Sequence, residues 1–188
     1  MDFTDAAITL FSSLTVVGQV IAVILIVMMF TEYFSRRRSG VTGWISSHAL
    51  LLMAVVAVAA MAGSLYFSEI AGWTPCKDCW LQRIFLYPQV PTLLIALWER
   101  DRSVAPYIFA LCIIGLYLSG DHYFDQVQAA LYPAVADPLK PCDLSGIPCA
   151  ATEIHFTFGY ITIPMMALTA SLLNAVGSVS MMMRRSAA

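Results

Sequence analysis

The chain has 188 residues, of which 60% are hydrophobic and 12% are charged, and its net charge is −2. A soluble domain normally has about twice that share of charged residues, so the composition argues against one large soluble domain. The slight negative charge gives no indication of nucleic-acid binding. Because the hydrophobic residues form long runs, the sequence predicts an all-α integral membrane protein embedded in a lipid bilayer.

Five hydrophobic runs are about long enough to cross a membrane as helices at 1.5 Å per residue. They cover residues of about 8–34, 44–67, 80–98, 104–118 and 158–180. The first run follows an acidic N-terminus rather than the basic segment of a signal peptide, so we expect a retained helix. The fourth run is short and can extend through His122. Prolines within or near the runs are expected to kink helices, namely Pro88, Pro91 and Pro164.

Basic residues predict the side of the membrane on which each connection lies. With five spans, one side holds seven arginines: Arg36, Arg37, Arg38, Arg100, Arg102, Arg184 and Arg185. The other side holds Lys77 and Lys140, while Arg83 falls within the third run. The positive-inside rule therefore places the arginine-rich side and the C-terminus in the cytoplasm and the N-terminus outside. Four of the five cysteines then lie outside, where disulfides persist: Cys76, Cys79, Cys142 and Cys149.

The first cysteine pair, Cys76 and Cys79, stands in a CxxC arrangement at the outer start of the third run. A helix N-terminus stabilises a thiolate, which favours redox chemistry. Arg83 lies four residues after Cys79 and therefore on the same helical face. It could stabilise the Cys79 thiolate and polarise a quinone carbonyl, because an arginine inside a membrane is usually functional. The alternative is a structural disulfide with Arg83 extending to the interface.

The second pair, Cys142 and Cys149, lies in the long outer loop of residues 121–157. Turn-forming Pro and Gly residues around it make a local disulfide plausible. Such a disulfide is either accessible to an attacking thiolate or a structural link within the loop. The four cysteines could instead form a zinc site, but the oxidising side of a membrane disfavours four reduced thiolates, so we expect no metal.

The remaining candidates are weaker. His122, at the outer end of the fourth run, lies where a quinone ring would sit, although a histidine at a helix end is more often an interface residue. The segment from His122 to Pro133 has apolar residues at helical spacing, which predicts an amphipathic helix on the outer surface. His48 is expected to be structural, and His155 could have either role. Cys112 is expected to be a small buried apolar residue.

The stretch from Cys76 to Pro88, CKDCWLQRIFLYP, closely resembles the C-x-x-C-W-x-Q-R-I-x-x-Y-P motif of the DsbB family, in particular its BdbC branch. Pro148-Cys149 and the later stretch from Phe158 to Pro164 are also similar to that branch. The resemblance covers roughly Trp44 to the C-terminus. It implies a DsbB-like four-helix transmembrane bundle in residues 41–183. The chain departs from the family pattern in an extra transmembrane helix and a basic turn in residues 1–40, and we expect a cytoplasmic tail in residues 184–188.

The resemblance also implies an activity, a protein-dithiol:quinone oxidoreductase of the bacterial cytoplasmic (inner) membrane. A DsbA-like thioredoxin-fold partner would form a mixed disulfide with Cys142, whose loop mate is Cys149. Cys76 would exchange with that pair, and Cys79 would pass electrons to a quinone, either ubiquinone or menaquinone. Arg83 matches the quinone-site arginine of the family, and His122 resembles a position near the quinone.

Two other functions fit parts of the sequence. Vitamin K epoxide reductase-like proteins also combine a membrane CxxC with loop cysteines, but the order of the cysteine pairs and the residues from Trp80 to Pro88 disfavour them here. A non-enzymatic scaffold would use the same disulfides to hold its loops. Thiols whose oxidation state never responds to a reduced partner and a quinone would favour the scaffold.

Overall fold

The computed structural model describes residues 3–35, 39–131 and 157–185. These residues form six α-helices: α1 (Phe3–Ser35), α2 (Gly40–Leu65), α3 (Lys77–Leu86), α4 (Gln89–Glu99), α5 (Ala105–Leu131) and α6 (Ile163–Arg185). A short π-helix, η1 (Tyr66–Ile70), continues α2, and a 3₁₀ helix, η2 (Arg102–Val104), precedes α5. The predicted all-α fold is confirmed.

Four helical stretches of the described residues are long and apolar enough to cross a membrane: Phe3–Ser35, Gly40–Ile70, Arg102–Leu131 and Ile163–Arg184. The remaining expected span, of about residues 80–98, consists of two shorter helices, α3 with 10 residues and α4 with 11. The break falls at Tyr87 and Pro88. Tyr87 and Pro88 keep helical dihedrals, but Pro88 has no N–H to donate, so the helical hydrogen-bond pattern is interrupted there, as the proline signal indicated.

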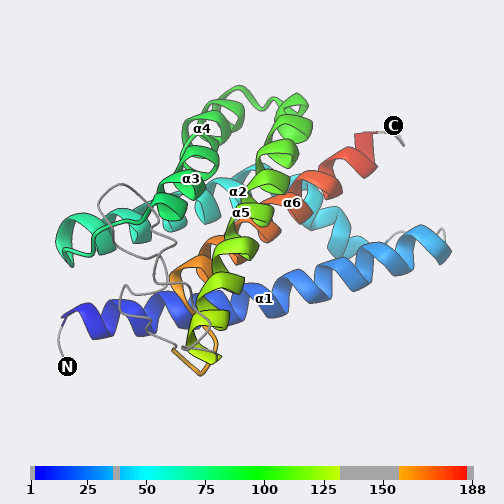
Figure 1. The fold of residues 1–188 in the computed structure, drawn as a ribbon. Coiled ribbons are helices and arrows are strands. Elements are labelled where there is room, and N and C mark those ends of the chain that lie inside the picture. The colour runs from blue at the N-terminus through cyan, green and yellow to red at the C-terminus, as the bar shows by residue number, and fades with distance from the viewer. Residues whose placement is uncertain (1–2, 36–38, 132–156, 186–188) are drawn as a thin grey trace.

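The helix α6 is central to the fold, since α1, α2 and α5 all pack against it (Figure 1). Small residues bring the helices close together. A Cβ on Gly177 of α6 would lie 2.7 Å from the Met53 Cγ of α2, and one on Gly115 of α5 would lie 2.9 Å from the Ser171 Oγ of α6. Inside a bilayer, such close packing rather than removal from water drives helix association.

A buried polar cluster joins the α3–α4 break to its neighbours. The Gln89 Nε2 donates to the Phe85 carbonyl at 2.9 Å across the break. Its Oε1 accepts from the Asn174 Nδ2 at 2.9 Å and from the Cys112 Sγ at 3.6 Å. These bonds satisfy backbone and side-chain groups that could not reach water. Cys112 is buried, as predicted, but it also donates a hydrogen bond.

Two expected helix boundaries were wrong. The segment predicted as a separate surface helix is the last part of α5, because its helical spacing continues the buried face of that helix through His122 and Gln126. Helix α6 begins at Ile163 rather than near residue 158. Phe158 and Gly159 have φ values of 54° and 82°, which a helix cannot accommodate, and they form a turn before α6.

The helix α1 packs along α6 rather than standing apart in the membrane. The Gln19 Nε2 of α1 donates to the Thr169 Oγ1 of α6 at 3.2 Å, and the Gln19 Oε1 accepts from the Tyr160 hydroxyl at 2.7 Å. Gly18 lies against the same helix, where a Cβ would come within 3.3 Å of Thr169. These contacts fix α1 beside the N-terminal half of α6.

Candidate functional site

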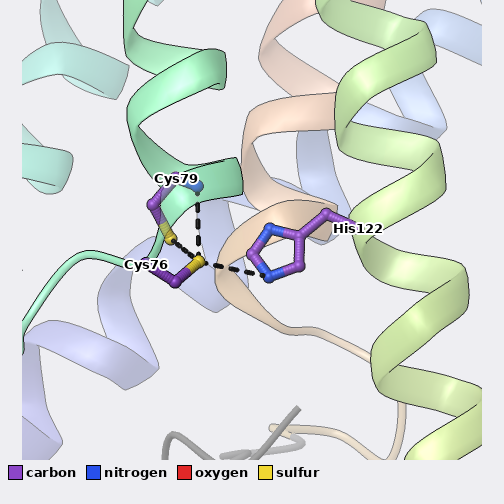
Figure 2. Close-up of side chains that lie close together, drawn as sticks. All are labelled: Cys76, Cys79 and His122. Carbon is purple, nitrogen blue, oxygen red and sulfur yellow. Dashed lines mark hydrogen bonds between the residues drawn. The ribbon is translucent and has the colours of Figure 1, made fainter. Parts of the chain in front are cut away.

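The first cysteine pair forms the N-terminal turn of α3 (Figure 2). Cys76 is the N-cap residue with an extended backbone, and its Sγ accepts a hydrogen bond from the Cys79 N–H at 3.4 Å. The two sulfur atoms are thiols 3.1 Å apart, with the Cys76 S–H donating to Cys79. Cys76 is buried and Cys79 is half-buried. A small rotation of either side chain would therefore allow a disulfide to form.

His122 of α5 faces Cys76, as Figure 2 shows, with its Nε2 3.7 Å from the Cys76 Sγ. The other ring nitrogen, Nδ1, is 2.9 Å from the Gln82 Nε2 of α3. If Gln82 donates to Nδ1, the ring proton resides on Nε2 and stabilises negative charge on Cys76. His122 is thus buried at the cysteine pair rather than exposed as an interface residue.

Arg83 is buried and held on α2 rather than extended to the membrane surface. Its Nε donates to the Ser64 Oγ at 3.0 Å, and its Nη2 donates to the Ser64 carbonyl at 3.0 Å. The guanidinium also lies over the Trp80 ring at 5.2 Å and the Tyr87 ring at 5.8 Å, both within cation–π range. These contacts fix the positive charge one helical turn after Cys79.

The two cysteines differ in acidity. The S–H that Cys76 donates to Cys79 lowers the pKa of Cys79, against the opposing effect of burial, and the Arg83 charge lowers it further. The same hydrogen bond, together with burial, raises the pKa of Cys76. Cys79 is therefore the more acidic thiol of the reduced pair.

This difference predicts the order in which the reduced pair reacts with an alkylating agent. With limiting iodoacetamide, Cys79 should be labelled before Cys76, and it should remain reactive to a lower pH than a free cysteine, because the thiolate is the nucleophile. Mass spectrometry of the labelled peptides across a pH series measures both. Faster labelling of Cys76 would contradict the assignment.

The pair opens into a cavity of about 770 Å³ that lies between α1, α2, α3, α5 and α6. Most of its lining is apolar. Its polar lining includes Gln82, Arg83 and His122 beside the cysteines, Gln126 one helical turn after His122, and Thr162. The other polar residues that line it are Thr15, Ser64, Ser68, Thr74 and Thr169. The Oε1 of Gln126 and the Oγ1 of Thr162 are buried without a hydrogen-bond partner among the described residues. Buried polar atoms normally have partners, so this end of the cavity suits a ligand with polar groups.

The sequence had not indicated four of these residues. Gln82 and Ser64 position His122 and Arg83, and Thr162 and Gln126 line the cavity. A signal existed for Gln82 and Ser64, because polar residues within hydrophobic runs usually have a function or a partner. Gln126 lies beyond the expected fourth run. Thr162 falls near the start of the expected fifth run, but the turn that brings it to the cavity is not readable from hydrophobicity.

Cys76, Cys79 and His122 could together hold a metal ion. The ligand atoms of Cys76, Cys79 and His122 lie within 4.8 Å of one another. Two thiolates and an imidazole suit a soft ion such as Zn²⁺. This set differs from the four-cysteine site considered from the sequence, because Cys142 and Cys149 lie outside the described residues, as does His155.

Comparisons with known proteins identify the family. The model of disulfide bond formation protein DsbB matches residues 46–183. Disulfide bond formation protein C of Bacillus subtilis is 45% identical over 119 residues, which are 63% of this chain and 81% of that protein. A probable disulfide formation protein C of Bacillus cereus is 40% identical over 131 residues, 70% of this chain and 89% of that protein. No solved structure gives a significant match. The predicted family is therefore confirmed: the chain belongs to the DsbB family of disulfide bond formation proteins.

Proposed function

We propose that this protein reoxidises a DsbA-like thioredoxin-fold protein and passes the electrons to a membrane quinone. The observation that carries the proposal is the opening of the Cys76–Cys79 pair into an apolar cavity beside the buried Arg83. A soluble oxidant would not need an apolar cavity within a membrane helix bundle, whereas a lipid-soluble quinone does. The membership of the DsbB family supports the same direction of electron flow, towards disulfide formation.

The proposed relay has three balanced steps. A thiolate of the reduced partner attacks the Cys142–Cys149 disulfide at Cys142 and forms a mixed disulfide. The partner's second thiol then resolves it, so the partner leaves with a disulfide and the loop is left with two thiols. The loop thiols then reduce the Cys76–Cys79 disulfide and become a disulfide again. The reduced Cys76–Cys79 pair finally gives two electrons and two protons to the quinone, which becomes a quinol, and the pair returns to its disulfide.

Each residue of the site has a part in the last step. Cys79, the more acidic thiol, faces the electron acceptor as a thiolate, and Arg83 stabilises its charge and polarises a carbonyl of the acceptor. His122 stabilises the Cys76 sulfur while that sulfur takes part in exchange, with Gln82 fixing the ring orientation. Cys76 then attacks or releases Cys79 without a large movement, since the sulfurs lie 3.1 Å apart.

The cavity fits a quinone in both size and chemistry. Its volume, about 770 Å³, lies in the range of small-molecule pockets, roughly 300–1,000 Å³. Thr162 offers a buried hydroxyl for a quinone oxygen, and Arg83 offers a positive charge. A bound quinone supplies a two-electron acceptor at this point. These residues hold its ring, and the apolar lining excludes water.

We further propose five membrane crossings, with residues of about 80–98, in α3 and α4, forming the third. The N-terminus would lie on the periplasmic (extracytoplasmic) side of the bacterial membrane, with the Cys76–Cys79 pair at the outer start of that third crossing. At one end of the molecule, Arg100, Arg102 and Arg184 line one recess. Arg102 binds Ser46 near the start of α2, while Arg83 binds Ser64 near its end. At 1.5 Å per residue these serines are about 27 Å apart, so the cysteine pair and the arginine-rich end lie at opposite ends of α2.

The first step of the relay predicts a trapped complex. In a Cys149→Ser variant, Cys142 is a free thiol with no loop cysteine to resolve a mixed disulfide. The thioredoxin-fold partner is therefore supplied with a single active-site cysteine that carries nitrothiobenzoate in disulfide linkage, so that attack by the Cys142 thiolate joins the two proteins and releases nitrothiobenzoate. Most of the protein should then shift to a covalent complex on a non-reducing gel. The Cys142→Ser variant is the control and should give none. A complex formed equally by both variants would contradict the assignment of Cys142.

A further inference from the structure

The N-terminal helix α1 lies outside the part of the chain that matches the DsbB family, which begins at residue 46. Even so, α1 contributes to the cavity that contains the cysteine pair. Six of its residues line that cavity: Phe11, Leu14, Thr15, Val17, Gly18 and Ile21. The helix is therefore part of the candidate site.

The arrangement of α1 and α2 leaves a slot between them. Both helices pack on α6 (Figure 1). Phe11 of α1 contacts Gly63 of α2 and Phe67 of the π-helix that continues α2. The Phe11 ring packs edge-on against Phe67 at 5.8 Å, and a Cβ on Gly63 would come within 2.8 Å of it. Small α2 side chains, such as Ala59 and Ala60, line the same cavity as Val17 of α1.

The slot extends well away from the cysteine pair. Its lining includes Val55 of α2 and Ile21 of α1, whereas Arg83 is bound to Ser64. Val55 precedes Ser64 by about 13 Å along α2 at 1.5 Å per residue. The side chains between these two levels on α1 and α2 are almost all apolar, so the cavity has a polar end at the cysteines and an elongated apolar end between α1 and α2.

We propose that α1 forms one wall of a slot that holds the prenyl tail of the quinone, and that it makes the protein prefer tailed quinones to tail-less ones. The proposal rests on the proposed function, since it assumes that the quinone ring binds near Cys79 and Arg83. A quinone ring with a long apolar tail matches the polar and apolar ends of this cavity. Because lipid is as apolar as the tail, the preference must come from close packing against α1 and α2.

A matched pair of substitutions tests the role of α1. Val17 and Val20 are both 55% exposed on α1, but Val17 lines the cavity and Val20 does not. In Val17→Trp the indole would fill the slot, whereas in Val20→Trp it would face away from it. A second pair, Ile21→Trp and Ile24→Trp, repeats the comparison one turn further along the helix.

The measurement is equilibrium binding by the full-length protein in lipid nanodiscs. The probes are a decyl-substituted benzoquinone and the same ring without the decyl chain, with concentrations expressed per lipid so that partitioning cancels. We expect Val17→Trp to bind the decyl quinone about tenfold more weakly than the unchanged protein, corresponding to about 1.4 kcal/mol. It should bind the tail-less ring with the same affinity as the unchanged protein. Val20→Trp should bind both as the unchanged protein does.

The outcomes separate this proposal from the proposed function. Equal binding of the decyl quinone by both members of each pair would overturn the tail slot, as would an equal loss of both quinones in Val17→Trp. If the unchanged protein binds neither quinone, the proposed function itself fails. The thermal unfolding midpoint of each variant shows whether the variant is folded. If Val17→Trp is not folded, the comparison of Ile21→Trp with Ile24→Trp tests the tail slot.

Discussion

A Cys79→Ser variant is expected to lose quinone reduction almost completely, by about a thousandfold or more, as is typical when a reacting nucleophile is removed. The serine hydroxyl cannot form a disulfide with Cys76, so the pair cannot release two electrons. The thiolate favoured by the Cys76 hydrogen bond and by Arg83 is also lost. The decrease of quinone absorbance, with purified protein and a reduced thioredoxin-fold partner, measures the rate.

Cys112 provides a matched control for this substitution. It is a free cysteine of the described residues, but it is buried in the core of α5 and donates to Gln89 at 3.6 Å. A serine at this position keeps that donor, so Cys112→Ser should retain quinone reduction. A Cys79→Ser variant that turns over at the parental rate would show that Cys79 does not donate electrons to the quinone.

An Arg83→Gln variant is expected to bind quinone about ten- to a hundredfold more weakly, because a hydrogen bond to a charged group contributes about 1.5–3 kcal/mol. The pKa of Cys79 should rise at the same time, since the Arg83 charge helps to lower it. The thiolate fraction at a given pH then falls, so the alkylation profile of Cys79 should move to higher pH. Quinone titration and the alkylation series measure the two effects separately.

Arg102 is the matched control for Arg83. Each arginine donates from its guanidinium to both the hydroxyl and the carbonyl oxygen of a serine on α2, Ser46 for Arg102 and Ser64 for Arg83. Arg102→Gln removes a comparable anchor at the other end of the helix, so it tests for a general loss of stability. Unchanged quinone affinity in Arg83→Gln, or equal losses in both variants, would count against a role of Arg83 at the quinone.

Local sequence features predicted the elements of the site well. Long hydrophobic runs indicated the helices, Pro88 indicated the irregular third span, and the spacing of Cys76, Cys79 and Arg83 indicated one helical face. The structure places Cys76 at the N-cap and Arg83 one turn after Cys79, as that spacing requires. These predictions succeeded because they depend on interactions within about one helical turn.

Contacts between distant segments could not be predicted in the same way. The pairing of Arg83 with Ser64, of His122 with Cys76, and the position of Thr162 at the cavity depend on how the helices pack. Hydrophobic periodicity shows which face of a helix is buried, but not which other helix packs against that face. This also explains why the end of α5 was mistaken for a separate surface helix: its buried residues, His122 and Gln126, are polar, whereas Phe124 and Leu131 are exposed.

The two arginine–serine contacts on α2 fix the distance between the two segments that carry the arginines. Ser46 and Ser64 are bound by arginines from different parts of the chain, so their separation and their angular phase about the helix axis are both fixed. A residue inserted between them would add about 1.5 Å and rotate one serine by about 100° relative to the other. The distance between the Cys76–Cys79 pair and the arginine-rich end of the molecule is thereby set by the length of a helix that carries neither cysteine.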